Sequence, residues 1–156
     1  MTDRREISFT RVRLPYGWLG NMAPYPIVTE DGLRWLTSEA LFQAIRFARL
    51  NPIREHIRLN RSPMSAKMIA KAAADQRVVV PCSAEDIALM RCVLKLKVKQ
   101  HPELAPQIAD LKGVLIVEDV TARPHGSGLF WGAARDPDGS WRGENTLGKL
   151  WMEICG

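Results

Sequence analysis

The sequence contains little cysteine, and its cysteines follow no pattern of a disulfide framework or a metal site. Only Cys82, Cys92 and Cys155 occur among the 156 residues, and no C-x-x-C pair is present. A disulfide framework needs an even number of cysteines, and a zinc site needs closely spaced ligands. The three histidines are scattered as well. The sequence therefore predicts reduced, mostly buried cysteines and no bound metal.

Long apolar runs are also absent. No stretch approaches the ~18 consecutive apolar residues of a membrane-spanning helix. The charged residues 1–6 are not followed by the apolar segment of a signal peptide. We therefore expect a cytoplasmic protein that makes no contact with a membrane. Its length fits one domain, residues 1–156, better than two, and its 46% hydrophobic and 25% charged residues are typical of a globular chain.

Positive charge is in excess and is concentrated in one stretch. The chain has a net charge of +5, whereas residues 46–77 alone hold eight basic and two acidic residues, a net charge of +6. Such a field suits a ligand that carries phosphate, either a nucleotide or a nucleic acid. Arg54, Arg58 and Arg61 are spaced to share one face of a short helix. A solvated helical face explains the charge about equally well.

The order of predicted elements indicates an α+β fold that is mostly helical, in a single domain. Strands are predicted at residues 7–14, weakly at 76–80 and at 114–117, and Asp31-Gly32 predicts a hairpin between residues 25–28 and 33–35. Helices are predicted at residues 38–50 after the cap Thr37, around 54–61, and at 65–74, 83–101 and 103–110. A polar, glycine-rich loop is expected at 119–144, before a last helix capped by Asn145. This order lacks the regular strand–helix alternation of a Rossmann-like fold.

The helix predicted at residues 38–50 carries an unusual polar stripe. Glu39, Gln43 and Arg46 recur at helical spacing on a segment that is otherwise apolar. Such a stripe can line a cleft, where a carboxylate activates water or stabilises a cation. The alternative is that Glu39 only complements the positive end of the helix dipole, and the spacing alone slightly favours this simpler interpretation.

The loop before the last helix combines tryptophans, glycines and a helix start. Trp131-Gly132 and Trp141 place aromatic rings beside flexible backbone, and the turn at 136–139 contains Asp138. Long structured loops in small domains often have a function. Arg142 and the backbone N–H groups after Asn145 suit a phosphate. Tryptophans of this kind can stack on a nucleobase, although an isolated tryptophan is more often part of the core.

Three blocks of motifs together resemble the YbiA-like, or NADAR, family. The first block includes Tyr16-Gly17, Asn21 and the run Trp35-Leu36-Thr37-Ser38-Glu39-Ala40-Leu41-Phe42-Gln43-Ala44. The second block covers residues 90–97, His101-Pro102 and residues 115–118. The third block runs from Trp131-Gly132 through Asp136-Pro137 to Trp141-x-Gly143-x-Asn145-x-Leu147-Gly148. Each motif is modest alone. Together they cover nearly the whole chain in the family's order.

The resemblance implies an N-glycosidase, an enzyme that hydrolyses a ribose–nitrogen bond in a nucleotide-like substrate and needs no metal or organic cofactor. Carried over by position, Glu39 is expected to be the catalytic carboxylate and Trp131 an active-site aromatic residue. The substrate-binding residues that we predict are Asn21, Gln43, Arg46, Gly132, Asp138, Trp141, Arg142 and Asn145.

Departures from the family pattern bear on the substrate. Arg46 replaces a usual lysine, and no tryptophan lies near Pro81-Cys82, where members that act on riboflavin intermediates often have one. With the basic stretch, this favours ADP-ribose linked to guanine, free or in a nucleic acid. Two alternatives stay open: hydrolysis of ribosylamino-pyrimidine phosphates of riboflavin biosynthesis, and a non-catalytic module that binds ADP-ribose or nucleic acid. The oligomeric state cannot be inferred.

Overall fold

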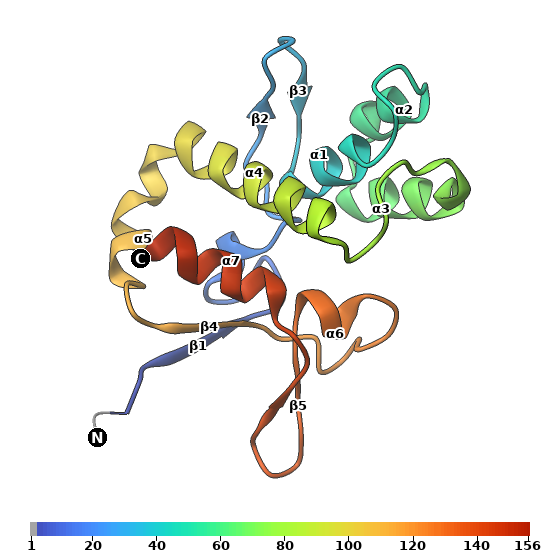
Figure 1. Ribbon diagram of the computed structural model, residues 1–156. Coiled ribbons are helices and arrows are strands. Elements are labelled where there is room, and N and C mark those ends of the chain that lie inside the picture. Colours follow the sequence, from blue (N-terminus) through green and yellow to red (C-terminus); the bar gives the residue numbers. More distant parts are fainter. Residues whose placement is uncertain (1–2) are drawn as a thin grey trace. The chain divides into compact units, whose positions relative to one another are not determined.

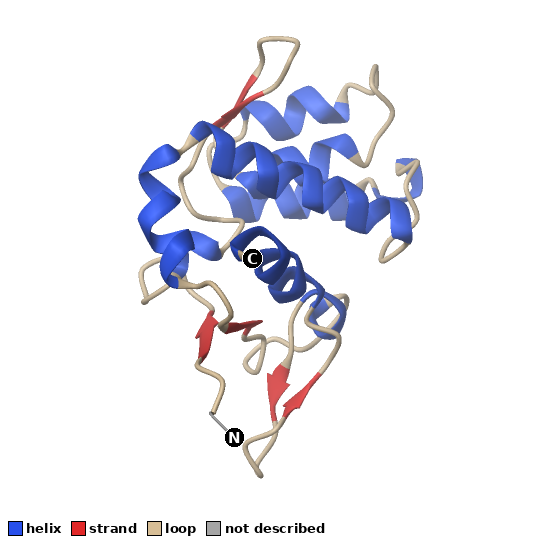
Figure 2. Ribbon diagram, turned by 60° about the vertical axis from the view of Figure 1, so that its left-hand side comes forward, coloured by secondary structure: helices blue, strands red, loops and turns tan. Residues whose placement is uncertain are grey.

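Helices dominate the described part of the chain, and its strands form only short pairs (Figure 2). The computed structural model describes residues 3–156; Met1 and Thr2, which begin the charged N-terminal stretch, lie outside the described residues. Three two-stranded sheets are present among residues 3–156. The predicted α+β, mostly helical fold class is therefore confirmed. No helix in residues 3–156 combines the length and the apolar character needed to cross a membrane.

Contacts between Cα atoms divide the chain into two units. The terminal unit comprises Met1–Gly20 and Glu103–Gly156, and the central unit comprises Asn21–Pro102. Residues 6–9 and 115–118 therefore lie side by side in this unit although they are far apart in the sequence. The 82 residues between Gly20 and Glu103 form a unit of their own.

The central unit is a group of helices preceded by a small hairpin. Its elements are β2 (Ile27–Val28), β3 (Arg34–Trp35), α1 (Ser38–Ile45), α2 (Ile53–Leu59), α3 (Pro63–Ala72), the 3-10 turn η2 (Ala74–Gln76) and α4 (Ala84–Gln100). The antiparallel β2–β3 pair confirms the predicted hairpin. Helix α1 packs against α2, α3 and α4 (Figure 1). Its residues Leu41 and Ala44 are almost completely buried, so α1 lies at the centre of this unit.

Hydroxyl side chains begin the main helices of the central unit, as the sequence predicts. The Thr37 hydroxyl accepts a hydrogen bond from the Ala40 N–H at 3.1 Å and starts α1. Ser83 accepts in the same way from the Asp86 N–H at 3.2 Å and starts α4. These bonds satisfy N–H groups that have no partner within the helix.

Helix α1 is shorter than predicted. It ends at Ile45 with Arg46 as its C-cap, five residues before the predicted end at Leu50. The Arg46 carbonyl accepts from the Val78 N–H at 3.0 Å, and Phe47 forms an isolated antiparallel bridge with Arg77. The chain therefore leaves the helix where it can pair with a distant segment and bury Phe47 completely.

Two further predictions for the central unit are wrong. Arg61 does not share a helix with Arg54 and Arg58, because α2 ends at Leu59. Residues 76–80 do not form a strand: Gln76 ends η2, and Arg77 makes only the isolated bridge to Phe47. The β-branched run there makes one isolated bridge to a distant segment and does not join a sheet.

The terminal unit joins the first strand to the last third of the chain. Its elements are β1 (Glu6–Phe9), the 3-10 turn η1 (Gly17–Leu19), α5 (Ala105–Asp110) after the turn η3 (Pro102–Leu104), β4 (Leu115–Glu118), α6 (Gly128–Trp131), β5 (Ala134–Arg135), β6 (Trp141–Arg142) and α7 (Thr146–Cys155). β1 and β4 pair in parallel, with Ile7 opposite Ile116. α7 packs on β4, α5 and α6, and its Trp151, fully buried, donates to the Leu19 carbonyl at 2.9 Å.

Several predictions for the terminal unit are confirmed and others need correction. The strand at 114–117, the helix near 103–110 and the last helix are present with small shifts of their ends. The N-terminal strand stops at Phe9 rather than at residue 14, because turns follow from residue 11. The predicted loop at 119–144 contains α6 and the β5–β6 hairpin. Cys155 is buried and Cys82 partly so, whereas Cys92 is exposed, and all three are free thiols.

Candidate functional site

Glu39 lies in the first turn of α1, where its side chain is buried in a row of polar groups. Only 8% of the residue is exposed. Its Oε1 accepts a hydrogen bond from Gln43 Nε2 at 2.9 Å, and Gln43 Oε1 accepts from Arg46 Nη1 at 3.2 Å. The i, i+4, i+7 spacing thus places Glu39, Gln43 and Arg46 on one face of α1, as the sequence predicts. This face is buried inside the central unit and is not exposed to solvent.

A fourth residue, Asp86 of α4, completes this row. Asp86 is fully buried. Its Oδ1 lies 2.9 Å from Arg46 Nε, and its Oδ2 accepts from Arg46 Nη2 at 3.2 Å and from the Cys82 N–H at 2.8 Å. We call Glu39, Gln43, Arg46 and Asp86 the Glu39 network. Sequence reasoning assigned Asp86 only to the capping turn of α4, because no local pattern shows that it faces a residue 40 positions earlier.

The surroundings of Glu39 change the acidity of its carboxyl group. Burial raises the pKa of Glu39 above that of an ordinary glutamate, because the ionised form loses its hydration. The hydrogen bond from Gln43 and the positive charges of Lys67 and Arg46 act in the opposite direction and lower it. A carboxylate of raised pKa is a stronger base at neutral pH than one in water.

Among the buried side-chain atoms of residues 3–156 that have no hydrogen-bond partner, two belong to uncharged residues of the central unit. They are Asn21 Oδ1 and Ser38 Oγ. The Asn21 carbonyl accepts from the Glu39 N–H at 2.9 Å, so the backbone of Asn21 lies beside α1, and Ser38 adjoins Glu39 in the chain. Buried polar atoms are normally paired. These two atoms are therefore candidates to bind hydroxyl groups of a ligand; Asn21 was predicted as such, whereas Ser38 was not.

Lys97 of α4 is a second buried ionisable group of the central unit. The residue is fully buried, and burial lowers the pKa of its ammonium group to about 7. The Nζ atom lies 5.0 Å from the centre of the Tyr25 ring, in the geometry of a cation–π contact. Near neutral pH the side chain is therefore divided between its neutral and charged forms. The sequence placed Lys97 only within a family motif.

The terminal unit holds the predicted pair Trp131 and Gly132. Trp131 ends α6, is half-buried, and meets the Phe130 ring edge to face with centroids 4.9 Å apart. A Cβ atom on Gly132 would lie 2.6 Å from the Glu118 carbonyl oxygen. Only glycine fits this close approach to β4. The backbone after Trp131 is therefore fixed against the strand.

Asn145 is tied to the same strand. It adopts a left-handed conformation, with φ 52°, immediately before α7. Its Nδ2 donates to the Ile116 carbonyl at 2.9 Å, and its Oδ1 accepts from the Glu118 N–H at 3.0 Å. Asn145 is the N-cap residue by position, as predicted, but its side chain makes no capping bond to α7. The side chain instead attaches the start of α7 to β4.

Asp138, Trp141 and Arg142 lie on the β5–β6 hairpin, which projects from the rest of its unit (Figure 1). Each is held by contacts within the terminal unit. Asp138 Oδ1 accepts from the Ser140 hydroxyl at 2.6 Å, and these bonds to Ser140 lower the pKa of Asp138. Trp141 Nε1 donates to Glu6 Oε1 at 3.1 Å, and the Arg135 guanidinium lies over the Trp141 ring. Arg142 Nε donates to Asp136 Oδ1 at 3.2 Å. Asp138 and Arg142 are exposed to solvent and Trp141 is half-buried, in contrast to the buried Glu39 network.

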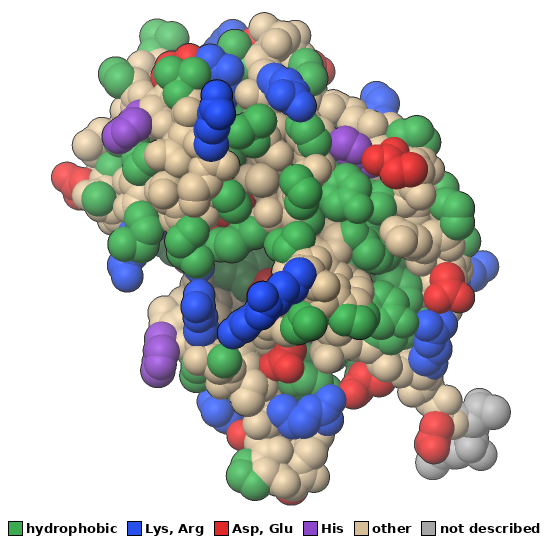
Figure 3. Space-filling view, turned by 180° about the vertical axis from the view of Figure 1, so that it is seen from behind, with side chains coloured by type: hydrophobic (Ala, Val, Ile, Leu, Met, Phe, Trp, Pro, Cys, Tyr) green, Lys and Arg blue, Asp and Glu red, His purple; other side chains and the backbone are tan. Residues whose placement is uncertain are grey.

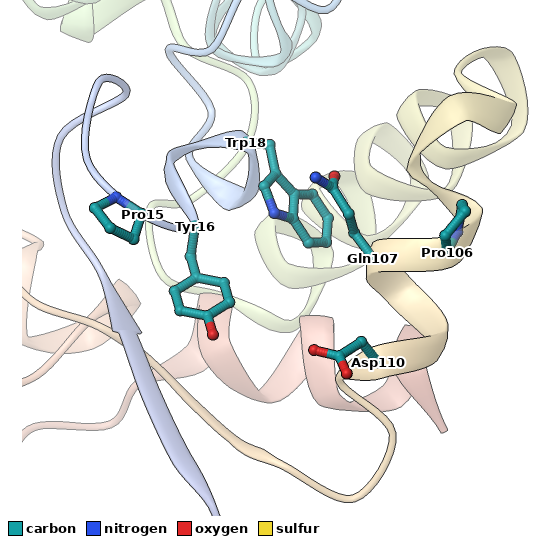
Figure 4. Close-up of a pocket in the computed structure, with 6 residues that line it drawn as sticks. All are labelled: Pro15, Tyr16, Trp18, Pro106, Gln107 and Asp110. Carbon is teal, nitrogen blue, oxygen red and sulfur yellow. The ribbon is translucent and has the colours of Figure 1, made fainter.

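A separate groove of the terminal unit, about 440 Å³ in volume, contains none of the predicted residues. It is lined by Pro15, Tyr16, Trp18, Pro106, Gln107 and Asp110 (Figure 4). Arg5 connects its two sides, because the guanidinium donates to the Tyr16 hydroxyl at 3.1 Å and to Asp110 Oδ2 at 3.2 Å. The groove holds aromatic rings and one paired carboxylate, so it lacks the environment that alters the acidity of Glu39.

The basic stretch at residues 46–77 is partly neutralised. Arg46 pairs with Asp86, Arg58 pairs with Glu55, and Arg54 donates to the Phe47 carbonyl at 2.8 and 3.0 Å. The basic side chains of this stretch that form no ion pair with any described residue include Arg49, Arg61, Lys67 and Lys71. On the face shown in Figure 3, Lys and Arg side chains are spread among apolar and polar ones. The positive charge is therefore more dispersed than the sequence suggests.

Comparisons with known proteins agree over almost the whole chain. The family model of the NADAR domain matches residues 8–155. "N-glycosidase YbiA" of Escherichia coli K12 is 33% identical over 150 residues, which cover 95% of this chain and 85% of that protein. "N-glycosidase YbiA" of Shigella boydii is 33% identical over 149 residues, with the same shares covered.

A solved structure shows the same fold. The NMR structure of the E. coli protein YbiA superimposes with a TM-score of 0.76 at 30% sequence identity, over 99% of this chain and 84% of that chain.

Proposed function

Since this chain belongs to the NADAR domain family, we propose that it removes ADP-ribose from guanine bases by hydrolysing the ribose–nitrogen bond. The general activity follows from the family and from its named relatives: the chain is an N-glycosidase, a hydrolase of N-glycosyl bonds. A substrate of the nucleotide kind fits this activity. What we propose beyond this general activity is the identity of the substrate and of the residues that act on it.

The observation that carries the proposal is the buried carboxylate of Glu39. Breaking a ribose–nitrogen bond builds positive charge on the sugar, and an ionised carboxylate beneath C1 stabilises that charge in the transition state. Its raised pKa also suits a general base that takes a proton from the attacking water, a contribution of ~10²–10⁴-fold. Asn21 Oδ1 and Ser38 Oγ, which lack partners, are suited to accept hydrogen bonds from hydroxyl groups of the ribose.

For the terminal unit taken by itself, we propose from the family resemblance that Trp131, Gly132 and Arg142 contribute to substrate binding. Trp131 is half-buried and offers an aromatic face for stacking, and Gly132 lets the backbone approach closely. Arg142 and the backbone N–H groups at the start of α7 suit the diphosphate. Arg46 was predicted to share this role, but its three guanidinium nitrogens already face Asp86 and Gln43, so we do not include it among the phosphate ligands.

The charge of the central unit supports a nucleic-acid substrate over a small metabolite. Arg49, Arg61, Lys67 and Lys71 form no ion pair with a described carboxylate, and such side chains favour a phosphate backbone. The sequence also lacks a tryptophan near Pro81-Cys82. Ribosylamino-pyrimidine phosphates remain the second candidate, because they contain the same type of bond and one phosphate.

The test is a comparison of substrates under the same conditions. Purified protein is incubated with a DNA oligonucleotide that carries ADP-ribose on guanine, and separately with a ribosylamino-pyrimidine 5′-phosphate, and the released sugar is measured by mass spectrometry. We expect free ADP-ribose from the DNA, at a rate that falls as salt is raised. Turnover of the pyrimidine alone would overturn the proposed substrate and support the second candidate.

A further inference from the structure

The Asp86–Arg46 ion pair is costly to bury, and it is additional to the bond that Asp86 accepts from the Cys82 N–H beside the start of α4. Both residues are almost completely inaccessible, with 0% and 6% of their surfaces exposed. Removing two charges from water usually costs more than their attraction returns, so such pairs are poor stabilisers and are kept for other reasons. Arg46 Nη2 donates to Asp86 Oδ2 at 3.2 Å, and Arg46 Nε lies 2.9 Å from Oδ1 without forming a hydrogen bond, so the guanidinium is held against the carboxylate by one hydrogen bond and one close charge contact.

The fixed guanidinium determines the orientation of the neighbouring amide. An arginine side chain can only donate hydrogen bonds, so the Gln43 atom 3.2 Å from Arg46 Nη1 has to be the oxygen. The Gln43 NH₂ group must then point the other way along α1, and it donates to Glu39 Oε1 at 2.9 Å. With the amide reversed, Gln43 would present its oxygen to the carboxylate and repel it. Arg46 therefore donates to both Asp86 and Gln43, and Gln43 in turn donates to Glu39.

We propose that Asp86 and Arg46 are positioning residues: they hold Gln43 with its amide nitrogen toward Glu39, which fixes Glu39 Oε1 and leaves Oε2 as the oxygen that acts on the substrate. Neither Asp86 nor Arg46 touches the reacting atoms in this account. The inference rests on the proposed role of Glu39, and it adds α4 to the catalytic machinery through a residue outside the motifs of α1.

The charges around Glu39 determine how the Glu39 network changes the pKa of the Glu39 carboxyl group. Lys67 of α3 and Arg46 at the end of α1 are the cations that act on the carboxyl group, and Asp86 of α4 balances Arg46. The Gln43 hydrogen bond and both cations lower the pKa of Glu39, against the effect of burial. Loss of the Gln43 donor or of the Arg46 charge therefore raises the pKa of Glu39, and the acidic limb of the pH–rate profile moves to higher pH with it.

The most direct test is a titration of Glu39 itself, which needs no substrate. The carboxyl carbons of glutamate are labelled with ¹³C, and the Glu39 resonance is identified as the one that Glu39→Gln removes. We expect a higher pKa in Gln43→Met and in the double variant Arg46→Met with Asp86→Asn. The double variant removes both charges together and keeps an oxygen at residue 86 for the Cys82 N–H.

Ser83→Ala is the matched control for a purely structural effect. It removes the cap of α4 but keeps the side-chain partners of Asp86. This variant should unfold at a lower temperature with the pKa of Glu39 unchanged. If Gln43→Met and the double variant also titrate like the wild type, the positioning role is overturned. If the double variant does not fold, Arg46→Lys replaces it, because lysine keeps the positive charge but cannot hold both the Asp86 carboxylate and the Gln43 oxygen in the guanidinium geometry.

Activity provides the second readout and separates this inference from the proposed function. On the modified DNA we expect kcat to fall about tenfold or more in Gln43→Met and in the double variant, with little change in KM, because a charge-assisted hydrogen bond is lost in the reacting state. Full activity of Glu39→Gln would contradict the role of Glu39 itself. An inactive Glu39→Gln beside variants with wild-type kcat and pH profile would contradict only the positioning role.

Discussion

Polar side chains are arranged in opposite ways in the Glu39 network and in the β5–β6 hairpin. In the network, Glu39 and Asp86 are buried and are bonded to residues of their own row. In the hairpin, Asp138 and Arg142 make similar bonds but remain exposed to water. Exposed pairs of this kind contribute ~0–1 kcal/mol, whereas buried charges are costly unless every partner is present. The buried arrangement is therefore the one that needs a functional explanation.

Asn145 lies between these extremes, because it is buried but its partners are backbone groups. Asn145→Ala removes two hydrogen bonds and leaves Ile116 O and Glu118 N–H unpaired. We expect the free energy of unfolding to fall by about 3 kcal/mol and the Tm by about 10 °C. Thermal unfolding followed by circular dichroism measures the change. Asn60→Ala, which loses one accessible bond, is the control; an equal effect of both variants would show that Asn145 does not attach α7 to β4.

Trp131 tests whether the terminal unit contributes a stacking surface. Trp131→Ala should lower kcat/KM by about tenfold to a hundredfold, because stacking of a base on an aromatic ring contributes ~1–3 kcal/mol. Trp131→Phe keeps a ring and should retain most of the activity. Steady-state kinetics on the preferred substrate measure both. Equal losses in the two variants would indicate that packing against Phe130, and not stacking on the substrate, is what the indole provides.

The buried carboxylate of Glu39 should also reduce stability in a pH-dependent way. Its pKa in the folded state is raised above the unfolded value, so the favourable contribution is complete below the ordinary pKa of glutamate and is lost as the pH rises through the folded pKa. Glu39→Gln stays neutral. Its Tm relative to the wild type should therefore be higher at pH 8 than at pH 3.5. A difference that does not vary with pH would mean that Glu39 is not held in the environment described.

The smallest effect is expected in the hairpin. Arg142→Ala breaks an exposed ion pair with Asp136 and should change the free energy of unfolding by less than about 0.5 kcal/mol. Its role in phosphate binding predicts a higher KM with kcat unchanged. Urea denaturation and steady-state kinetics on the same preparation provide both values. A large loss of stability would remove the contrast between the hairpin and the Glu39 network.

Much of the fold could be predicted because its signals are local. Thr37 and Ser83 begin helices where a hydroxyl precedes an apolar repeat, and Asp31-Gly32 turns a hairpin. The parallel pairing of β1 with β4 could not be predicted, because it joins segments about 100 residues apart and leaves no mark in either one. The early end of α1 has a similar cause, since the segment around Val78 captures the backbone at Arg46.

In the candidate site, too, the residues that share one helix could be predicted, and those brought in from elsewhere could not. The spacing of Glu39, Gln43 and Arg46 gave their common face, and the structure shows that this face is bonded along its length. Asp86 was missed because its partner lies on another helix. Ser38 was missed because a serine at the start of a helix is ordinary, and only its burial without a partner makes it notable.

One comparison tests most directly whether Glu39 is the catalytic carboxylate. Glu39→Gln and Glu55→Gln are the same chemical change in the central unit, but Glu55 is exposed and pairs only with Arg58. In single-turnover release of ADP-ribose from modified DNA, we expect the rate of Glu39→Gln to fall by about 10² to 10⁴ and that of Glu55→Gln to match the wild type. A folded Glu39→Gln protein with wild-type rate would contradict the account.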